Sequence, residues 1–455
     1  MGLSLLLLGI ICASVHISTT SPIADSASNT GKPLFLTPYV EEGRFIEART
    51  ASRVPSLPGA PTVESYSGYL TVNKEYNSNL FFWFFPAENN RQKAPFALWL
   101  QGGPGGSSLY GTFAENGPFS INEDDLTLTQ GKHYWSQELN MIYIDSPVGT
   151  GFSFTQYEEG FATNETRVGA DLYSALVQFF QLFPEYKKNK FFITGESYAG
   201  KYIPALAHTI HVNNPSADLK INLVGFAIGD GWIDPRNMMV YSEYLLQHGI
   251  VDEKTAAAMK IHEKNATALI DQKKFHEATE EWHKVVGLFE AATGGELSTY
   301  DYTLVHNNFD GDEDLISRYL NQPHVRKAIH VGDLVYNDGS KVSQHLFDDM
   351  TKSVADWLEE LLDHYKVLLY NGQLDIIVAY PLTMSFVKTL KWSGAAAYAK
   401  ASRELWYVEN ELAGFHKTVG NFTEILVRNA GHMVPGDQPL WALDMITRFT
   451  QGIPF

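Results

Sequence analysis

Short continuous apolar runs alternate with amphipathic segments through the first half of the chain. Gly68–Val72 and Leu80–Phe85 have the composition of hairpin strands, and Ala94–Leu100 and Phe191–Ile193 are typical of buried strands. Strand and helix patterns then alternate as far as Ala227. This alternation predicts an α/β fold in which a mostly parallel central sheet is covered by helices on both faces.

The pattern becomes helical over residues 233–320, where Phe275, Trp282 and Phe289 recur at helix spacing. We predict that this segment is a helical cap inserted between two parts of one sheet domain, residues 63–232 and 321–455. The cap would shape a cleft, and its aromatic stripe is more typical of packing than of ligand binding.

A candidate nucleophile lies where one buried run ends, in Gly195-Glu196-Ser197-Tyr198-Ala199-Gly200. A serine hydroxyl is a poor nucleophile, so it must project from a tight turn, with a base nearby and amides free to hold an oxyanion. The strict motif is G-x-S-x-G, and here Ala199 takes the last place and Gly200 follows. Alone, such a serine is also typical of an ordinary turn or helix cap.

Two later strand ends strengthen this interpretation. The apolar run Lys366–Tyr370 leads into a turn with Asp375, and Ile425–Val427 leads into a loop with His432. Taken separately, they are an ordinary turn residue and a loop histidine. Together with Ser197 they give the order Ser, acid, His, which is the chain order of the α/β-hydrolase triad.

A glycine-rich loop supplies candidate donors for an oxyanion. The strand-like run ending at Leu100 is followed by Gln101-Gly102-Gly103-Pro104-Gly105-Gly106. Glycines let backbone N–H groups converge on a small anion. No Gly-Lys-Ser/Thr follows, so a phosphate-binding loop is not favoured. We predict that the amides of Gly103 and Tyr198 form the oxyanion hole.

Six segments in order carry a family resemblance: WLQGGPGGSSLYG, AENGPF, NMIYIDSPVGTGFSF, TGESYAGKYIP, NGQLDIIV and NAGHMVPGDQP. They resemble the serine carboxypeptidases, a family of α/β-hydrolases, and most of all their vitellogenic carboxypeptidase-like branch. The resemblance implies hydrolysis of C-terminal peptide bonds at acidic pH through an acyl-enzyme. It makes Ser197 the nucleophile, His432 the general base and Asp375 the residue that orients the imidazole.

The resemblance also implies a site for the substrate's free α-carboxylate, built from Gln101, Gly102, Glu115 and Glu196. Many members have Asn at the position of Gln101 and Cys at that of Gly106. A carboxylate at Glu196 would repel the carboxylate of a peptide unless it were protonated, which favours acidic pH. A solvated acid at a helix N-terminus is the alternative for Glu196.

Length and charge fit a large secreted hydrolase. The 455 residues carry a formal net charge of -18, which argues against nucleic acid and anionic membrane surfaces as partners. Residues 1–20 are typical of a secretory signal peptide and residues 21–62 of a loosely held leader or propeptide. No later apolar run is long enough for a membrane span. We therefore expect a secretory-pathway protein, either secreted or lysosomal/endosomal.

The chain's single cysteine is Cys12, inside the predicted signal peptide, so the mature enzyme would hold its fold without a disulfide. Sequons at Asn164, Asn265 and Asn421 agree with a secretory route. No HExxH motif or other ligand cluster indicates a metal, and no cofactor is expected.

The expected partners are peptides or proteins with a free C-terminus, and the sequence does not indicate an oligomeric state. Two alternatives stay open at this point: an esterase or acyltransferase using the same triad, and an inactive binding or storage protein.

Overall fold

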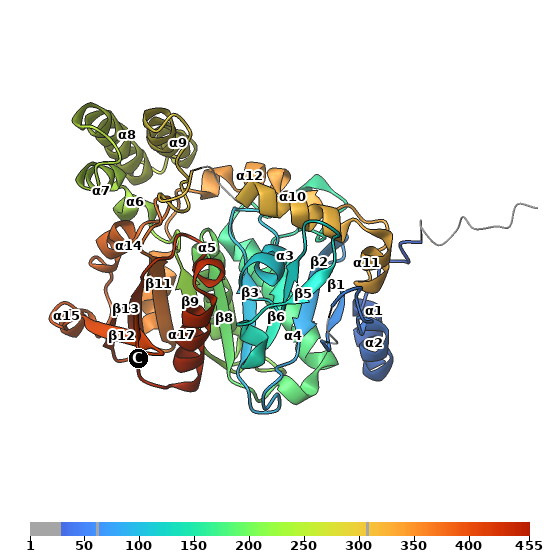
Figure 1. Cartoon of the computed structure of the whole chain (residues 1–455). Coiled ribbons are helices and arrows are strands. Elements are labelled where there is room, and N and C mark those ends of the chain that lie inside the picture. Colours follow the sequence, from blue (N-terminus) through green and yellow to red (C-terminus); the bar gives the residue numbers. More distant parts are fainter. Residues whose placement is uncertain (1–28, 61–62, 306–308) are drawn as a thin grey trace, which may run out of the picture.

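A ten-stranded sheet runs through the molecule in the computed structural model, which describes residues 29–60, 63–305 and 309–455 (Figure 1). The strand order is β1-β2-β6-β3-β8-β9-β11-β14-β13-β12. The strands are β1 (Tyr66–Asn73), β2 (Ser78–Phe85), β3 (Phe96–Leu100), β6 (Asn140–Ile144), β8 (Phe191–Glu196), β9 (Leu223–Gly229), β11 (Lys366–Gly372), β12 (Glu404–Val408), β13 (Glu411–Val419) and β14 (Phe422–Val427).

The six central strands, from β6 to β14 in that order, pair in parallel, and antiparallel hairpins form the two edges. The predicted mostly parallel sheet is therefore confirmed. Because parallel strands end at one edge, the loops after β3, β8, β11 and β14 are brought together there.

Both faces of this sheet are buried, which explains the uninterrupted apolar run of β2. Successive side chains of a strand point to opposite faces. Phe82 and Phe84 join the core on one face, whereas Phe81 and Trp83 join the core on the other.

Helices cover each face. Side chains of α4 (Glu165–Leu182) and α5 (Ala199–Asn213) belong to the first core, and those of α17 (Pro439–Gln451) to the second. Other helices include α11 (Pro323–Ala328), α12 (Ser340–His345), α13 (Ala355–Leu362), α14 (Tyr380–Val387), α15 (Ala395–Tyr398) and α16 (Val434–Asp437).

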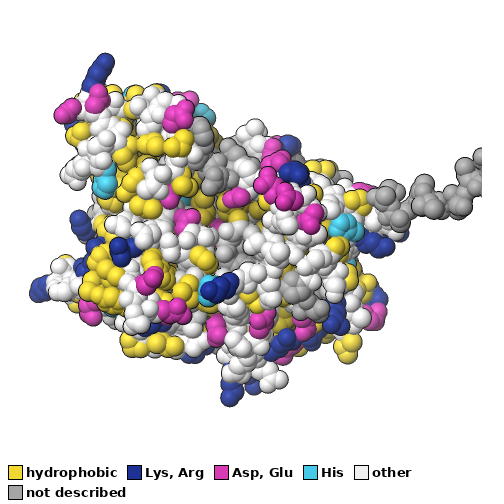
Figure 2. Space-filling view, viewed as in Figure 1, with side chains coloured by type: hydrophobic (Ala, Val, Ile, Leu, Met, Phe, Trp, Pro, Cys, Tyr) yellow, Lys and Arg dark blue, Asp and Glu magenta, His cyan; other side chains and the backbone are white. Residues whose placement is uncertain are grey.

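Helices dominate the segment predicted to be a cap. It contains α6 (Pro235–Met238), α7 (Tyr241–Gln247), α8 (Glu253–Asp271), α9 (Phe275–Ala292) and α10 (Phe309–Leu320). Figure 1 shows α8 and α9 as a pair that projects beyond the sheet. Figure 2 shows acidic side chains gathered on the surface over α10, which carries Asp312, Glu313 and Asp314.

The described part of the predicted leader is folded. It forms α1 (Thr37–Glu41) and α2 (Phe45–Ser52), which lie beside β1 in Figure 1. Leu36 donates its amide to the carbonyl of Tyr69 at 2.9 Å, and the side chains of Leu36 and Ala48 are buried. The expectation of a loosely held segment is wrong for these residues, because Leu36 and Ala48 belong to the core and the Leu36 amide is bonded to β1, although Phe45 and Ile46 of α2 are exposed.

The predicted signal peptide and Cys12 lie outside the described residues. Within the part of the chain that is described, no helix combines the length and the apolar composition that crossing a bilayer requires.

Candidate functional site

Ser197 sits on a sharp turn between β8 and α5. Its φ of 60° lies in the left-handed region, which is unfavourable for a residue with a side chain and is typical of strained functional turns. The turn is held by bonds to the strand beside it, because the Ser197 amide donates to Gly229 at 3.0 Å and its carbonyl accepts from Trp232 at 2.9 Å.

Close approach of other atoms explains why glycine occupies positions 102 and 200, which lie near Ser197. A Cβ at Gly102 would lie 2.5 Å from the Cβ of Ser197, and one at Gly200 would lie 2.7 Å from the amide nitrogen of Trp232. The departure from the strict motif is therefore harmless: the crowded position is Gly200, and Ala199 is accommodated.

Asp375 and His432 form a buried pair. His432 Nδ1 lies 2.9 Å from Asp375 Oδ2, and the two side chains are 3% and 0% exposed. The amides of Ile377 and Val378 donate to the two oxygens of Asp375 at 2.9 and 3.2 Å. These bonds fix the carboxylate, which in turn fixes the plane and tautomer of the imidazole. His432 Nε2 is buried and has no hydrogen-bond partner among the described residues, Ser197 included.

Ser197 and His432 line one cavity of about 410 Å³. Gly103 and Tyr198 line it as well, so the residues predicted to stabilise an oxyanion face the same space as the candidate nucleophile. In the described structure the amides of Gly103 and Tyr198 donate to no backbone or side-chain acceptor, which leaves both free for a ligand.

Aromatic side chains form another wall of this cavity. Trp282 from α9 lies 5.3 Å from Trp232, ring centre to ring centre, and both line the cavity. Val285 and Phe289 of the same helix are buried in the core. Trp282 packs against the same core and donates its Nε1 to the Tyr241 hydroxyl at 3.1 Å, and it also lines the cavity.

Gln101, Glu115 and Glu196 form a compact buried cluster, of which Gln101 and Glu196 line the cavity. Gln101 Nε2 donates to Glu115 Oε1 at 3.0 Å and to Glu196 Oε1 at 2.7 Å. Its carbonyl oxygen accepts from Trp99 Nε1 at 2.9 Å, which fixes the orientation of the amide. Glu115 lies on the π-helical turn η1 (Gly111–Glu115), and Glu196 ends β8. Glu196 is 1% exposed, so a solvated helix-end acid is excluded.

Burial dominates the electrostatics of this pair. It raises the pKa of Glu115 to about 7, and burial together with the charge of Glu115 raises the pKa of Glu196 well above its ordinary value. Two buried carboxylates that accept hydrogen bonds from the same amide group of Gln101 cannot both ionise without a large cost in free energy. The pair therefore holds at least one proton at acidic pH.

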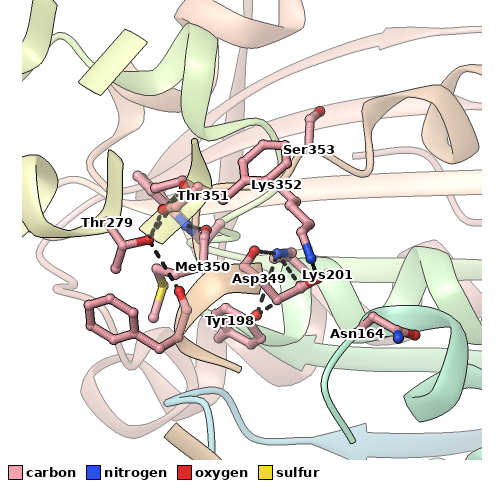
Figure 3. A network of polar contacts seen from close by, with 12 residues as sticks. Asn164, Tyr198, Lys201, Thr279, Asp349, Met350, Thr351, Lys352 and Ser353 are labelled. Carbon is pink, nitrogen blue, oxygen red and sulfur yellow. Dashed lines mark hydrogen bonds and ion pairs between the residues drawn. The ribbon is translucent and has the colours of Figure 1, made fainter. Parts of the chain in front are cut away.

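A second buried network, which the sequence did not suggest, lies behind Tyr198 (Figure 3). The Tyr198 hydroxyl donates to Asp349 Oδ2 at 3.1 Å, and Lys201 Nζ pairs with the same oxygen at 2.5 Å. Lys201 is 0% exposed. The lysine also donates to the backbone carbonyl of Asp349, next to Met350 in the cavity wall. The network therefore ties the turn that carries Tyr198 to a segment about 150 residues away.

The asparagines of the three sequons are exposed. Asn164 caps α4 by accepting the Arg167 amide at 3.1 Å through Oδ1, which leaves Nδ2, the atom that glycosylation modifies, without that bond. Asn265 lies within α8, and Asn421 in the turn between β13 and β14.

Known proteins resemble the chain over most of its length. The family model described as "Serine carboxypeptidase" matches residues 55–452. A venom serine carboxypeptidase of Apis mellifera is 48% identical, over 94% of this chain and 92% of the relative. A vitellogenic carboxypeptidase of Aedes aegypti is 46% identical, over 92% and 90%.

A solved structure is similar as well. It is that of Kex1Δp, a prohormone-processing carboxypeptidase from Saccharomyces cerevisiae, which matches with a TM-score of 0.80 at 25% identity, over 89% of this chain and 96% of that one. The predicted α/β-hydrolase fold agrees with this similarity.

Replacing Lys201 tests the network behind Tyr198. Lys201→Met should cost about 3–5 kcal/mol of stability, because it takes from the buried Asp349 its buried partner and leaves only the longer contact with the partly exposed Lys352. Lys352→Met is the matched control. Lys352 contacts the same carboxylate at 3.4 Å but is 37% exposed, so its removal should cost about 1 kcal/mol or less. Thermal and urea unfolding would measure both, and equal losses would contradict the assignment.

Proposed function

We propose that this chain, which belongs to the serine carboxypeptidase family and is a peptide hydrolase, cleaves the C-terminal peptide bond through Ser197, His432 and Asp375. The observation that carries the proposal is the Asp375–His432 hydrogen bond of 2.9 Å at the wall of the cavity that Ser197 and Glu196 also line, with Glu115 bonded to the same amide as Glu196.

In the first half-reaction, Ser197 Oγ attacks the scissile carbonyl while His432 Nε2 accepts its proton. The imidazolium then gives that proton to the leaving amine, and the released product is the C-terminal amino acid. Asp375 stays ionised, holds Nδ1–H and stabilises the imidazolium. Water repeats the sequence on the acyl-enzyme, with His432 again as base, and frees Ser197 and the shortened peptide.

The tetrahedral intermediate carries a negative oxygen that needs donors already in place. The free amides of Gly103 and Tyr198 are suited to this role, since each faces the cavity without a competing acceptor. Removing one such donor typically costs about 10²-fold to 10³-fold in rate. The strained turn at Ser197 keeps the nucleophile and the Tyr198 amide on the same side.

The Gln101–Glu115–Glu196 cluster would bind the substrate's α-carboxylate. A protonated glutamic acid and the buried amide both donate hydrogen bonds to a carboxylate, whereas an ionised pair would repel it. The pKa of Glu115 near 7 places the first loss of a proton from the pair around neutrality, and the raised pKa of Glu196 keeps its proton to higher pH. Peptide binding should therefore be strongest in acid.

We also propose that the protein enters the secretory pathway and acts there or outside the cell. Support comes from the predicted signal peptide and from the exposure of the asparagines of all three sequons. The acidic net charge and the buried protonated acids suit an acidic compartment.

Ser197→Ala tests the nucleophile. The variant should stay folded and lose acyl-enzyme formation, because no hydroxyl is left to attack. A fluorophosphonate probe should label the unmodified enzyme alone, with Ser107→Ala, a serine that lines the same cavity, still labelled as the control. Equal labelling of the Ser197→Ala protein would refute the triad.

The pH dependence of KM tests carboxylate recognition. For a peptide with a free C-terminus, KM should rise by up to about tenfold per pH unit above pH 7, where Glu115 loses its proton, and should keep rising at the higher pH where Glu196 loses its own. The matching peptide amide, which has no carboxylate, should not show this rise. Glu196→Gln should flatten the profile of the free acid, because an amide donates at any pH.

Asp338→Asn serves as the matched control for that experiment, since Asp338 lines the same cavity but is exposed and lies outside the cluster. Its KM profile should keep the wild-type slope. Identical profiles for free acid and amide in the wild-type enzyme would remove the carboxylate site and favour an esterase.

Expression in an animal cell tests the compartment. The purified chain should begin beyond residue 12, contain no titratable thiol once Cys12 is removed, and lose mass on deglycosylation. Single Asn→Gln changes at Asn164, Asn265 and Asn421 should each reduce the mass of the purified chain by that of one glycan. Recovery of a full-length, unglycosylated chain with a reactive cysteine would contradict a secretory route.

A further inference from the structure

A second acid is buried beside the proposed triad. Asp230 follows β9 with a φ of 41°, is 0% exposed, and is held by its amide, which donates to the carbonyl of Tyr370 at 2.8 Å. One side-chain ligand atom from each of Asp230, Asp375 and His432 lies within 4.8 Å of the other two. Within the described chain, this is a group with the spacing of a metal site.

Hydrogen bonding favours a proton over a metal ion at this place. Both oxygens of Asp375 accept backbone amides, and His432 Nδ1 is bonded to Asp375. The oxygens of Asp375 and Nδ1 of His432 are thus already committed to hydrogen-bond partners. No lysine or arginine pairs with either acid in the described structure, where the ion pair of Asp375 is with His432.

The two oxygens of Asp230 differ sharply. Oδ1 accepts from the Gly372 amide at 3.0 Å and from Asn371 Nδ2 at 3.2 Å. Oδ2 is buried and has no hydrogen-bond partner among the described residues. An ionised Asp230 would leave this buried oxygen without a donor, next to another carboxylate, and such burial of an unpaired charge is very costly.

A proton on Oδ2 removes this cost. Asp375 is the better anion of the two, because three donors face its oxygens. Asp230 is the better of the two to carry the proton, because a proton on its unpartnered Oδ2 can be donated in a hydrogen bond. Burial first, and then the charge of Asp375, raise the pKa of Asp230 well above its ordinary value.

We propose that Asp230 is a positioning residue of the triad, which keeps a proton on Oδ2, shares it with the Asp375 carboxylate and so holds the Asp375–His432 pair at a single negative charge. The inference rests on the proposed roles of Asp375 and His432.

The single charge matters for a base that works in acid. A second carboxylate charge this close to His432 would favour the imidazolium, which cannot accept the proton of Ser197. It would also push Asp375 away from its position. The other titratable groups that face Asp230 are Glu196 at the end of β8 and Tyr370 on β11, both buried. Neither supplies a cation that could neutralise an ionised Asp230.

The test uses an N-blocked ester that lacks a free carboxylate, so that the Glu115–Glu196 pair does not control binding. The wild-type kcat/KM should fall at alkaline pH, when Asp230 loses its proton. Asp230→Asn carries a neutral donor at every pH. It should keep at least about a third of the wild-type rate at pH 5, within the ordinary cost of a well-tolerated polar exchange, and it should lack the alkaline fall.

Asp230→Ala removes the donor and should lose about 10²-fold at every pH, as expected when a catalytic group shifts by about 1 Å. Asp234→Asn is the matched control. Asp234 is a buried acid of the same loop, bonded to Asn237, and its variant should keep the wild-type profile. Thermal unfolding of each variant shows whether it is folded, and Asp230→Asn decides the question if Asp230→Ala is not.

An alkaline fall of wild-type size in Asp230→Asn would overturn the proposal, as would a loss at pH 5 equal to that of Asp230→Ala in folded protein. Failure of the triad itself would be seen separately, as ester hydrolysis that survives Ser197→Ala.

Discussion

The burial of carboxyl groups without cations is the constraint on which this site depends. Glu115, Glu196, Asp230 and Asp375 are each at most 8% exposed and lie around one imidazole. In a dry site such groups can coexist only by sharing protons or by accepting several hydrogen bonds. Asp375 accepts several hydrogen bonds, whereas Glu115, Glu196 and Asp230 share protons.

The sheet makes this crowding possible. Strands β3, β8, β9 and β11 are adjacent and parallel, so Gln101, Glu196, Asp230 and Asp375 emerge at one edge within a few residues of the strand ends. The packed core on both faces supplies the rigidity, because the chain has a single cysteine and therefore no intrachain disulfide. The Lys201–Asp349 pair behind Tyr198 adds a long-range tie to the turn beneath the cavity.

Sequence reasoning worked where the signal is local. Ser197, Asp375 and His432 each follow a continuous apolar strand, so order and spacing were enough to predict their meeting, and the structure brings Asp375 and His432 into contact. Asp230 also follows an apolar strand, β9, but that position alone did not indicate its role, which depends on an unpartnered oxygen near a residue far away in the chain. The Lys201–Asp349 contact joins residues 148 apart, and nothing in either neighbourhood indicates the pairing.

The same acids link chemistry to stability. A carboxyl group whose pKa is raised by folding stabilises the native state below its unfolded pKa, near 4, and this contribution is lost as pH rises through the folded pKa. Glu115 loses it near pH 7, and Asp145 and Asp437, whose pKa values burial raises to about 6, lose it earlier. This part of the stability of the fold therefore declines toward neutral pH. If Glu115 and Glu196 bind a substrate carboxylate as proposed, the acidity that protonates them for binding is also the condition under which the buried acids are least costly.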